Sequence, residues 1–394
     1  MTSPVPGWDS VVLAASEATF GTVPNPAAAQ AMRVVDLVTG PTELGDIRPQ
    51  RDRNVGREMQ AAFVEGRVKG IPWSIEKSIM TRATAVTVPD ESVLWKAAGL
   101  LETVGGSSVA YTLRGSPDLD GSLVSASLYR LFGKGTSTVF ADQLRGCVIK
   151  TLSLAGGDRE LTFKAAGDAI GKHHLGRITS VTLVDGSGTT LTLGSADEAD
   201  QLGLGWYQIE AEVIKVTALA STTTRTIARA QLSTTGAAHA AQVMRPYVPT
   251  LSFSGAPIPE SGTVTVTLDA VVQRCMAFEV SLSTGIDLLP GESGSKYIQG
   301  AKVIRCDVTA TLKMVMSKTN AVSLLGKITR KKTPIALTLV QSTGVAGGIV
   351  TISMPYCELN PFPIPATAND AVIIDVSLRS FGSAGNDAIS VTMT

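Results

Sequence analysis

The sequence is poor in the residues on which most enzymes and nucleic-acid-binding proteins depend. Its 394 residues include only three His and four Cys, and aromatic side chains make up 5% and charged ones 17%. The 34 basic and 34 acidic side chains cancel to a formal net charge of zero. A protein that holds DNA or RNA through its phosphates carries excess positive charge, so we expect no such role here.

The sequence also lacks the marks of export and of membrane insertion. No stretch approaches the ~18 consecutive apolar residues of a membrane helix. The N-terminal residues carry no basic region and only a short apolar run, Val11 to Ala15, so we expect no signal peptide. The cysteines have neither zinc nor disulfide-framework spacing. We expect Cys147, Cys275 and Cys306 to be small buried side chains in a reducing cytoplasm.

Motifs for catalysis and for cofactor binding are missing as well. All three histidines, His173, His174 and His239, fall between positions 170 and 249, so the rest of the chain has no histidine base. His173 and His174 are adjacent and would point to opposite faces of a strand, so they could not share a metal ion. We therefore expect no catalytic, cofactor-binding or metal-binding residues and no enzyme activity.

Most of the chain alternates between apolar and polar residues, with the period of a β-strand. In the clearest segment, from Val303 to Met316, one face carries Ile304, Cys306, Val308, Ala310, Leu312, Met314 and Met316. The opposite face carries Arg305, Asp307, Thr309, Thr311 and Lys313. A second segment places Ile71, Trp73, Ile75 and Ile79 opposite Ser74, Glu76 and Ser78. The pattern predicts a mainly β fold.

Only two segments have the apolar spacing of an amphipathic helix, 90–101 and 319–328. Each opens with a residue suited to helix capping, Asp90 or Thr319. The spacing therefore predicts two short helices in a chain that is otherwise built from strands.

The surroundings of the two helical segments indicate an internal repeat. A shift of 245 positions places Leu37, Thr39 and Gly40 on Leu282, Thr284 and Gly285. Later offsets of 224 and 228 place Ser153-Leu154 on Ser377-Leu378 and Leu161 on Ile389. Differences in loop length between two copies produce such drift. We expect two tandem β-sandwich or barrel modules with one helix each, 1–169 and 250–394, separated by a small all-β insert at 170–249.

A polar loop in the first copy, Gly45 to Ala62, carries the densest group of arginines, mixed with acidic residues: Arg48, Arg51, Arg53 and Arg57. The mixed sign and the absence of interleaved aromatics favour contact with protein over contact with nucleic acid. The matching segment of the second copy, 286–300, is glycine-rich and nearly neutral. The two copies therefore meet different neighbours, or share one neighbour differently.

Several of these segments resemble one protein family. The sequence Glu17-Ala18-Thr19-Phe20-Gly21-Thr22-Val23-Pro24 resembles the N-terminal segment of the tail tube (major tail) proteins of long-tailed bacteriophages. The segment Met276 to Gly285, the alternating strand to Met316, the helix at Thr319 and the segment Gly348 to Pro355 resemble later parts of those proteins. The middle segment is similar to a small β-unit of phage structural proteins, in which His239 would be a turn residue.

The resemblance implies a structural virion protein that assembles with itself. Family members form rings of β-sandwich modules whose inner sheets join into a barrel, and the rings stack into a tube, the conduit for genome ejection. Two modules per chain imply a trimeric, pseudo-hexameric ring, with a plain hexamer as the alternative. The insert is then expected to be exterior and dispensable. The candidates for contacts between stacked rings are Arg48, Arg51, Arg53 and Arg57. Channel-facing candidates are Arg305, Asp307, Thr309, Thr311 and Lys313.

The partners implied by the resemblance are copies of the chain and other tail proteins, namely the tape measure, terminator and baseplate, while DNA passes through without specific binding. The chain would be made and assembled in the host cytoplasm and end in the virion tail. Two other classes stay open. One is a tail terminator or baseplate hub, which would stop at a single ring. The other is a non-phage β-sandwich surface or carbohydrate-binding protein, against which the missing signal peptide and disulfides count.

Overall fold

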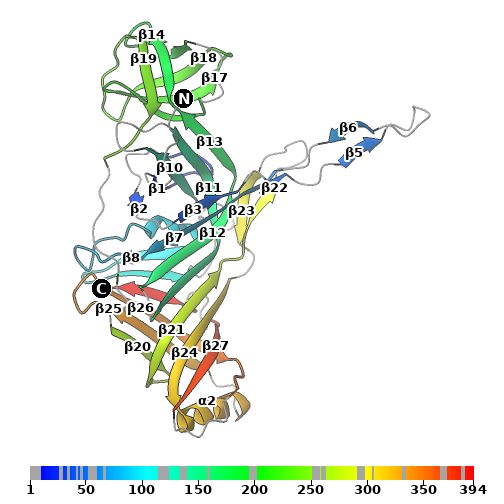
Figure 1. The fold of residues 1–394 in the computed structure, drawn as a ribbon, viewed down its shortest axis with the longest axis vertical. Coiled ribbons are helices and arrows are strands. Elements are labelled where there is room, and N and C mark those ends of the chain that lie inside the picture. Colours follow the sequence, from blue (N-terminus) through cyan, green and yellow to red (C-terminus); the bar gives the residue numbers. More distant parts are fainter. Residues whose placement is uncertain are drawn as a thin grey trace. The chain divides into compact units, whose positions relative to one another are not determined.

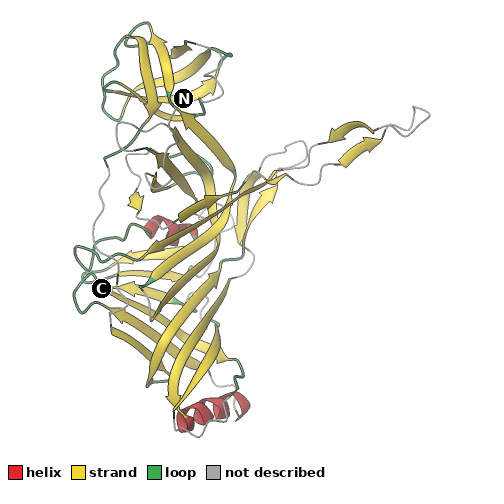
Figure 2. Cartoon of the chain, viewed as in Figure 1, coloured by secondary structure: helices red, strands yellow, loops and turns green. Residues whose placement is uncertain are grey.

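The computed structural model describes residues 10–25, 30–32, 36–40, 43–44, 48–51, 60–64, 68–113, 124–133, 140–157, 160–194, 202–250, 258, 263–290, 298–303, 306–330, 334–363, 371–382 and 387–394. The described residues form twenty-eight strands and two helices (Figure 1). The chain is therefore mainly β, with barrel-like sheets, as the alternating sequence predicts (Figure 2).

The chain folds as two compact units that are interleaved along the sequence. One, here called the barrel unit, comprises Met1–Arg33, Ser125–Cys147 and Ala169–Phe253. The other, here called the sheet unit, comprises Val34–Val124, Val148–Asp168 and Ser254–Thr394. The long strand β11 (Phe140–Gly157) begins in the barrel unit and ends in the sheet unit. The division into 1–169, 170–249 and 250–394 stays a prediction.

The barrel unit contains a small sheet and a closed six-stranded barrel. In the sheet, β1 (Ser10–Ser16) pairs with β2 (Gln30–Met32) and β10 (Ala126–Phe132). The first half of β11 pairs with β10 and with β13 (Gly171–Gly176). The barrel has the order β14-β15-β18-β17-β16-β19. Its strands are, in that order, Ile178–Leu183, Thr190–Leu193, Thr224–Gln231, Glu212–Leu219, Gly205–Ile209 and His239–Pro246.

One hydrophobic core joins the barrel to this sheet. The barrel contributes Val181, Tyr207, Ile214 and Met244, and the sheet contributes Leu13, Tyr129, Leu131 and Ala141. Full burial of one large apolar side chain is worth ~1.5–3 kcal/mol. The barrel is therefore held to the sheet by a shared core, and the expectation that it is a dispensable insert does not fit this contact.

The sheet unit contains a seven-stranded sheet with the order β3-β7-β12-β11-β21-β24-β27. The second half of β11 is its central strand. The other six are β3 (Asp36–Thr39), β7 (Val68–Ser78), β12 (Thr162–Ala169), β21 (Val271–Ser283), β24 (Asp307–Ser317) and β27 (Ala371–Ser380). We call this the inner sheet.

The strands that we call the outer sheet have the order β20-β25-β26-β28-β9-β8. They are continuous with the inner sheet, because β20 pairs with β21 and β26 pairs with β27. The strands of the outer sheet are, in that order, Thr263–Leu268, Ile335–Ser342, Ile349–Leu359, Ser390–Met393, Val109–Leu113 and Leu100–Val104. Two hairpins form separate two-stranded sheets, β5 (Arg48–Arg51) with β6 (Gln60–Val64), and β22 (Ile286–Pro290) with β23 (Ile298–Val303). The short β4 (Glu43–Leu44) pairs with β7.

Both predicted helices are present, with different ends from those expected. The first, α1 (Ser92–Ala97), is shorter than 90–101 because Gly99, at φ +83°, takes a left-handed conformation that ends it, and Leu100 begins β8. Trp95 of α1 packs between Tyr111 of β9 and Phe163 of β12, with ring centroids 5.3 and 5.0 Å away. The helix thereby fills the space between the two sheets.

The second helix, α2 (Lys318–Arg330), contacts β24 and buries Ala321 and Leu324. Its cap is Ser317, whose Oγ accepts the N–H of Asn320 at 3.2 Å. The predicted caps are wrong in both helices, because Thr319 lies inside α2 and Asp90 contacts Lys77 instead of the helix backbone.

The four cysteines are free, and two of them, Cys147 and Cys357, are buried. Cys275 is half-buried and Cys306 is exposed. The prediction of a buried thiol is therefore wrong for Cys306, because this residue precedes β24 instead of continuing its apolar face.

Candidate functional site: the polar face of the inner sheet

The alternating sequence of β24 gives the inner sheet one apolar and one polar face. Val308, Ala310, Leu312, Met314 and Met316 are buried, as predicted. Thr309, Thr311 and Lys313 are exposed and Asp307 is half-buried, which places all four on the opposite face. The fifth candidate of that face, Arg305, lies outside the described residues.

The register carries this polar face across the sheet. Ser281 of β21 lies opposite both Ser153 of β11 and Thr309 of β24. Ser153 lies opposite Lys164 of β12, and Thr309 lies opposite Arg379 of β27. Directly paired residues in antiparallel strands point to the same side. One row of hydroxyls, closed by a basic side chain at each end, therefore crosses five strands.

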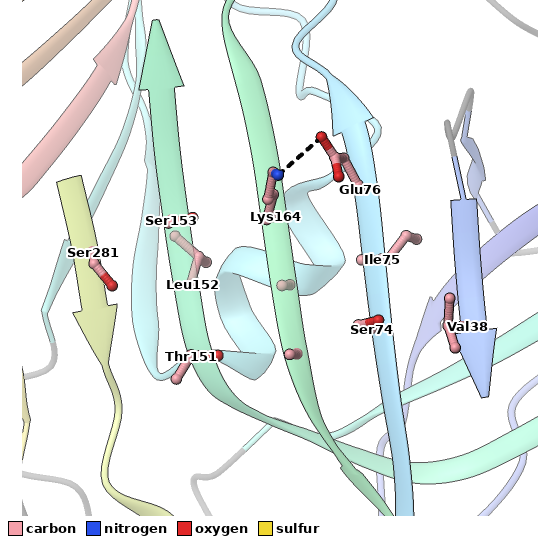
Figure 3. Close-up of a pocket in the computed structure, with 11 residues that line it drawn as sticks. Val38, Ser74, Ile75, Glu76, Thr151, Leu152, Ser153, Lys164 and Ser281 are labelled. Carbon is pink, nitrogen blue, oxygen red and sulfur yellow. Dashed lines mark ion pairs between the residues drawn. The ribbon is translucent and has the colours of Figure 1, made fainter. Parts of the chain in front are cut away.

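The face is hollowed where it crosses β3, β7, β12, β11 and β21 (Figure 3). The groove has a volume of about 370 Å³ and is lined mainly by small and hydroxyl side chains, among them Val38, Ser74, Thr151, Ser153 and Ser281. In Figure 3, Lys164 of β12 reaches toward Glu76 of β7, and their charged atoms are 3.1 Å apart. Serine and threonine hydroxyls and one ion pair therefore line the groove together with apolar side chains.

Charges of both signs are spread over the polar face. Arg379 and Asp307 form an exposed ion pair at 2.5 Å, and the hydrogen bond to Asp307 raises the pKa of Arg379. On β11, Lys150 contacts Asp168 at 2.5 Å and Asp287 at 3.6 Å. Burial opposes the charge of Lys150, but the two carboxylates outweigh it and raise its pKa. Among the described residues, this face holds no excess of positive charge for phosphate binding.

Half of the predicted arginine group lies outside the described residues. Arg48 and Arg51 are the first and last residues of β5, and Arg53 and Arg57 lie outside the described residues. The contact role of these arginines stays a prediction.

Sequence reasoning missed a buried charged cluster beneath α1. The Lys77 and Glu91 side chains have no exposed surface, and Lys77 Nζ contacts Glu91 at 2.7 Å and also Asp90. Burial opposes the charge of Lys77, but Glu91 and Asp90 outweigh it and raise the Lys77 pKa. Burial raises the pKa of Glu91 to about 7. The signal was visible, since Lys77 occupies an apolar position of the Ile71, Trp73, Ile75 and Ile79 alternation.

The barrel holds a second buried charged group. Glu212 accepts bonds from Arg229 at 2.8 and 2.5 Å, and His239 Nε2 lies 2.9 Å from it. Burial alone would raise the Glu212 pKa, but the Arg229, His239, Ala230 and Ala237 hydrogen bonds lower it to about 2. His239 opens β19, so the expected turn position is wrong. The group ties the barrel strands together.

The two adjacent histidines have different surroundings among the described residues. His174 Nδ1 lies 2.5 Å from Asp142, whereas burial lowers the pKa of His173 to about 4. No group of three or more His, Cys, Asp and Glu side chains in the described part of the chain could hold a metal ion. Neither of the two described helices is long and apolar enough to cross a membrane.

Comparison with known proteins gives no relative from which a function can be carried over. No family model matches the sequence, and no curated protein matches it.

Proposed function

We propose that the chain is a structural virion protein that assembles into stacked rings, the tail tube of a long-tailed bacteriophage. In this proposal the tube is the conduit for genome ejection, and the chain is not an enzyme. The inner sheets would form the wall of the channel, with the polar face turned to the lumen.

The first support is a set of ladders that occurs twice in the chain. β10 pairs with β1 and β11, while β25 pairs with β20 and β26. β11 also pairs with β12 and β13, while β26 also pairs with β27 and β28. Finally, β3 and β12 pair with β7, while β21 and β27 pair with β24. Two tandem modules would produce this correspondence.

A shared β-bulge indicates which residues of β10 and β11 correspond to which residues of β25 and β26. Ala126 pairs with Cys147 and Leu128 pairs with Leu144, so β11 carries an extra residue between these pairs. Ile335 pairs with Cys357 and Leu337 with Met354, which is the same irregularity on β26. Bulges are specific features of a fold, so a shared one favours duplication over chance likeness.

The observation that carries the proposal is the junction between the two sets of ladders. Thr151–Gly157 of β11 pairs with Ala277–Ser283 of β21 over seven residues. The first set therefore joins the second set edge to edge inside one chain. Repetition of this junction between chains would extend the inner sheet and cover edge strands that would otherwise aggregate.

The charge of the polar face agrees with a channel for DNA. A conduit should not hold the polyanion that passes through it, and basic residues on the wall would do so. Acidic residues Glu76, Glu279, Asp307 and Asp375 share the face with Lys164, Lys313 and Arg379. The passing DNA would therefore meet hydroxyls and mixed charges.

The proposal includes the finer assembly implied by the family resemblance. Two modules per chain favour a trimeric ring with pseudo-sixfold symmetry, with tape measure, terminator and baseplate proteins as partners in the virion tail. Arg48, Arg51, Arg53 and Arg57 remain the inter-ring candidates.

Negative-stain electron microscopy of the purified protein tests the proposal. We expect rings and tubes, with three chains per ring by native mass spectrometry. Single rings that never stack would favour a terminator or hub, and a protein that stays monomeric at all concentrations would contradict the proposal.

A further inference from the structure

The cluster beneath α1 has the composition of a reactive centre. Lys77 Nζ contacts Asp90 Oδ1 and lies 2.7 Å from Glu91 Oε2. The side chains of Lys77 and Glu91 are fully buried, whereas the Asp90 side chain keeps 25% of its surface exposed. An amine, a carboxyl group and a second carboxyl group thus meet where water reaches only the outer side of Asp90.

We propose that Lys77 and Asp90 form an intramolecular amide bond, with Glu91 as the catalytic proton relay. The modification requires no cofactor and no other protein. It is independent of the proposed function, because it concerns the interior of one chain.

The step is a condensation in which atoms and charges balance. Glu91 takes a proton from the Lys77 ammonium, and the lone pair of the freed amine attacks Cγ of Asp90. Glu91 passes this proton to an oxygen of Asp90, then takes a second proton from the attached nitrogen and gives it to the same oxygen, which departs as water. A C–N bond forms, a C–O bond breaks, and one water molecule leaves through the exposed side of Asp90. The ammonium and the carboxylate are consumed, and Glu91 ends in the state in which it began.

Glu91 is placed for this role by its contacts and its surroundings. Its Oε2 contacts the reacting nitrogen, while its Oε1 is buried without a hydrogen-bond partner among the described residues. That oxygen is available to exchange a proton. Burial raises the pKa of Glu91 to about 7, so both protonation states are accessible near neutral pH, as a relay requires.

Burial also supplies the reason for the bond to form. Desolvation of two charges costs several kcal/mol per ion, and an ion pair recovers this only with very good geometry. An amide replaces both charges with one neutral group. The exposed Lys164–Glu76 pair, at 3.1 Å, lacks this driving force because water solvates both ions. It therefore serves as an internal control.

Among the described residues, the second set of ladders has no lysine at the position that corresponds to Lys77. The correspondence follows from the strand pairs. Val38 of β3 corresponds to Ser283 of β21, and their partners Ser74 of β7 and Asp307 of β24 therefore correspond as well. The residue three positions further along is Lys77 in β7 and Ala310 in β24. The centre is therefore confined to the first set and is not a requirement of the strand arrangement.

Mass spectrometry of the denatured full-length protein tests the proposal without any variant. We expect an intact mass lower than the sequence mass by one water, no tryptic cleavage after Lys77, and a branched peptide that contains Lys77 and Asp90. An intact mass equal to the sequence mass, with normal cleavage after Lys77, would overturn the proposal.

Variants identify the residues that form the amide bond and the residue that relays the proton. Lys77→Ala and Asp90→Ala should abolish the mass loss, whereas the control Lys164→Ala should retain it. Asp90→Asn should lose ammonia in place of water, since the leaving group changes. Glu91→Gln should slow the reaction ~10²-fold or more. A water loss that persists in Asp90→Ala, or an unchanged rate in Glu91→Gln, would contradict the assignment.

Discussion

The same sheet face occurs twice in this chain, once covered and once open. In the barrel unit, Val11, Leu131, Ala141 and Leu175 form a row across β1, β10, β11 and β13. The corresponding row of the outer sheet, aligned by the shared bulge, is Thr265, Val340, Thr351 and Thr392. Leu131, Ala141 and Leu175 are buried under the barrel, whereas every residue of the second row is half-exposed.

The difference shows how one strand arrangement accepts two environments. Leucine and alanine on the first row pack into the core that the barrel shares. Threonine on the second row keeps β-propensity, since it is β-branched, and its hydroxyl meets water. The polarity of the side chains on a sheet face therefore indicates whether another layer of the protein covers that face.

Removal of the barrel should have the largest effect on this comparison. Replacement of Ile178–Pro246 by a short flexible linker would expose Leu13, Tyr129 and Leu131 to water. Exposed apolar patches of this kind cause aggregation. We expect an insoluble protein, measured as the soluble fraction after expression.

The outer sheet supplies the control for this deletion. The same deletion with Leu13→Thr and Leu175→Thr copies the open face, because Thr267 and Thr392 occupy these positions in the outer sheet. This variant should recover solubility in part. A deletion that is fully soluble without the threonines would show that the barrel is separable after all.

A single substitution on each row sharpens the comparison. Leu131→Thr should destabilise the protein by about 2–5 kcal/mol, because it removes a buried side chain and leaves a cavity. Val340→Thr, at the equivalent open position, should cost less than about 1 kcal/mol. Urea denaturation followed by circular dichroism measures both. Equal costs would contradict the alignment of the two rows.

Sequence periodicity alone could predict the faces of the strands. The buried and exposed residues of β24 and of the Ile71–Ile79 segment follow the period of two, since a half-buried strand imposes that pattern. Periodicity places Lys77 at a buried position but could not identify its partners, because Asp90 and Glu91 lie outside that strand.

The sequence offsets predicted a repeat, but they did not predict the strand correspondence that the ladders give. The offset of 224 placed Ser153 of β11 on Ser377 of β27, whereas the ladders match β11 with β26. The hairpin of β8 and β9 follows α1 and has no counterpart after α2, where β25 comes next. The strands of this extra hairpin alternate between apolar and polar residues like the strands beside them. A comparison of the sequences alone therefore aligned β11 with the strand after its true counterpart.

The barrel unit and the sheet unit should also respond to pH in opposite directions. The pKa of Glu212 is lowered to about 2 from an ordinary value of 4.5, so its contribution to stability is present above pH 4.5 and is lost as the pH falls toward 2. The pKa of Glu91 is raised from 4.5 to about 7, so its contribution is complete below pH 4.5 and is lost as the pH rises through 7.

Hydrogen exchange measured from pH 4 to 8 with correction for the intrinsic rate can separate the two units. Protection of β7 and α1 should fall toward pH 8, and Glu91→Gln should remove that slope, because the amide imitates the protonated acid. Below pH 4.5, acid unfolding should begin in the barrel, and Glu212→Gln should remove its acid dependence while lowering its protection at neutral pH. A common pH profile for both units would mean that Glu91 and Glu212 titrate alike, and that burial does not raise the pKa of Glu91 beneath α1.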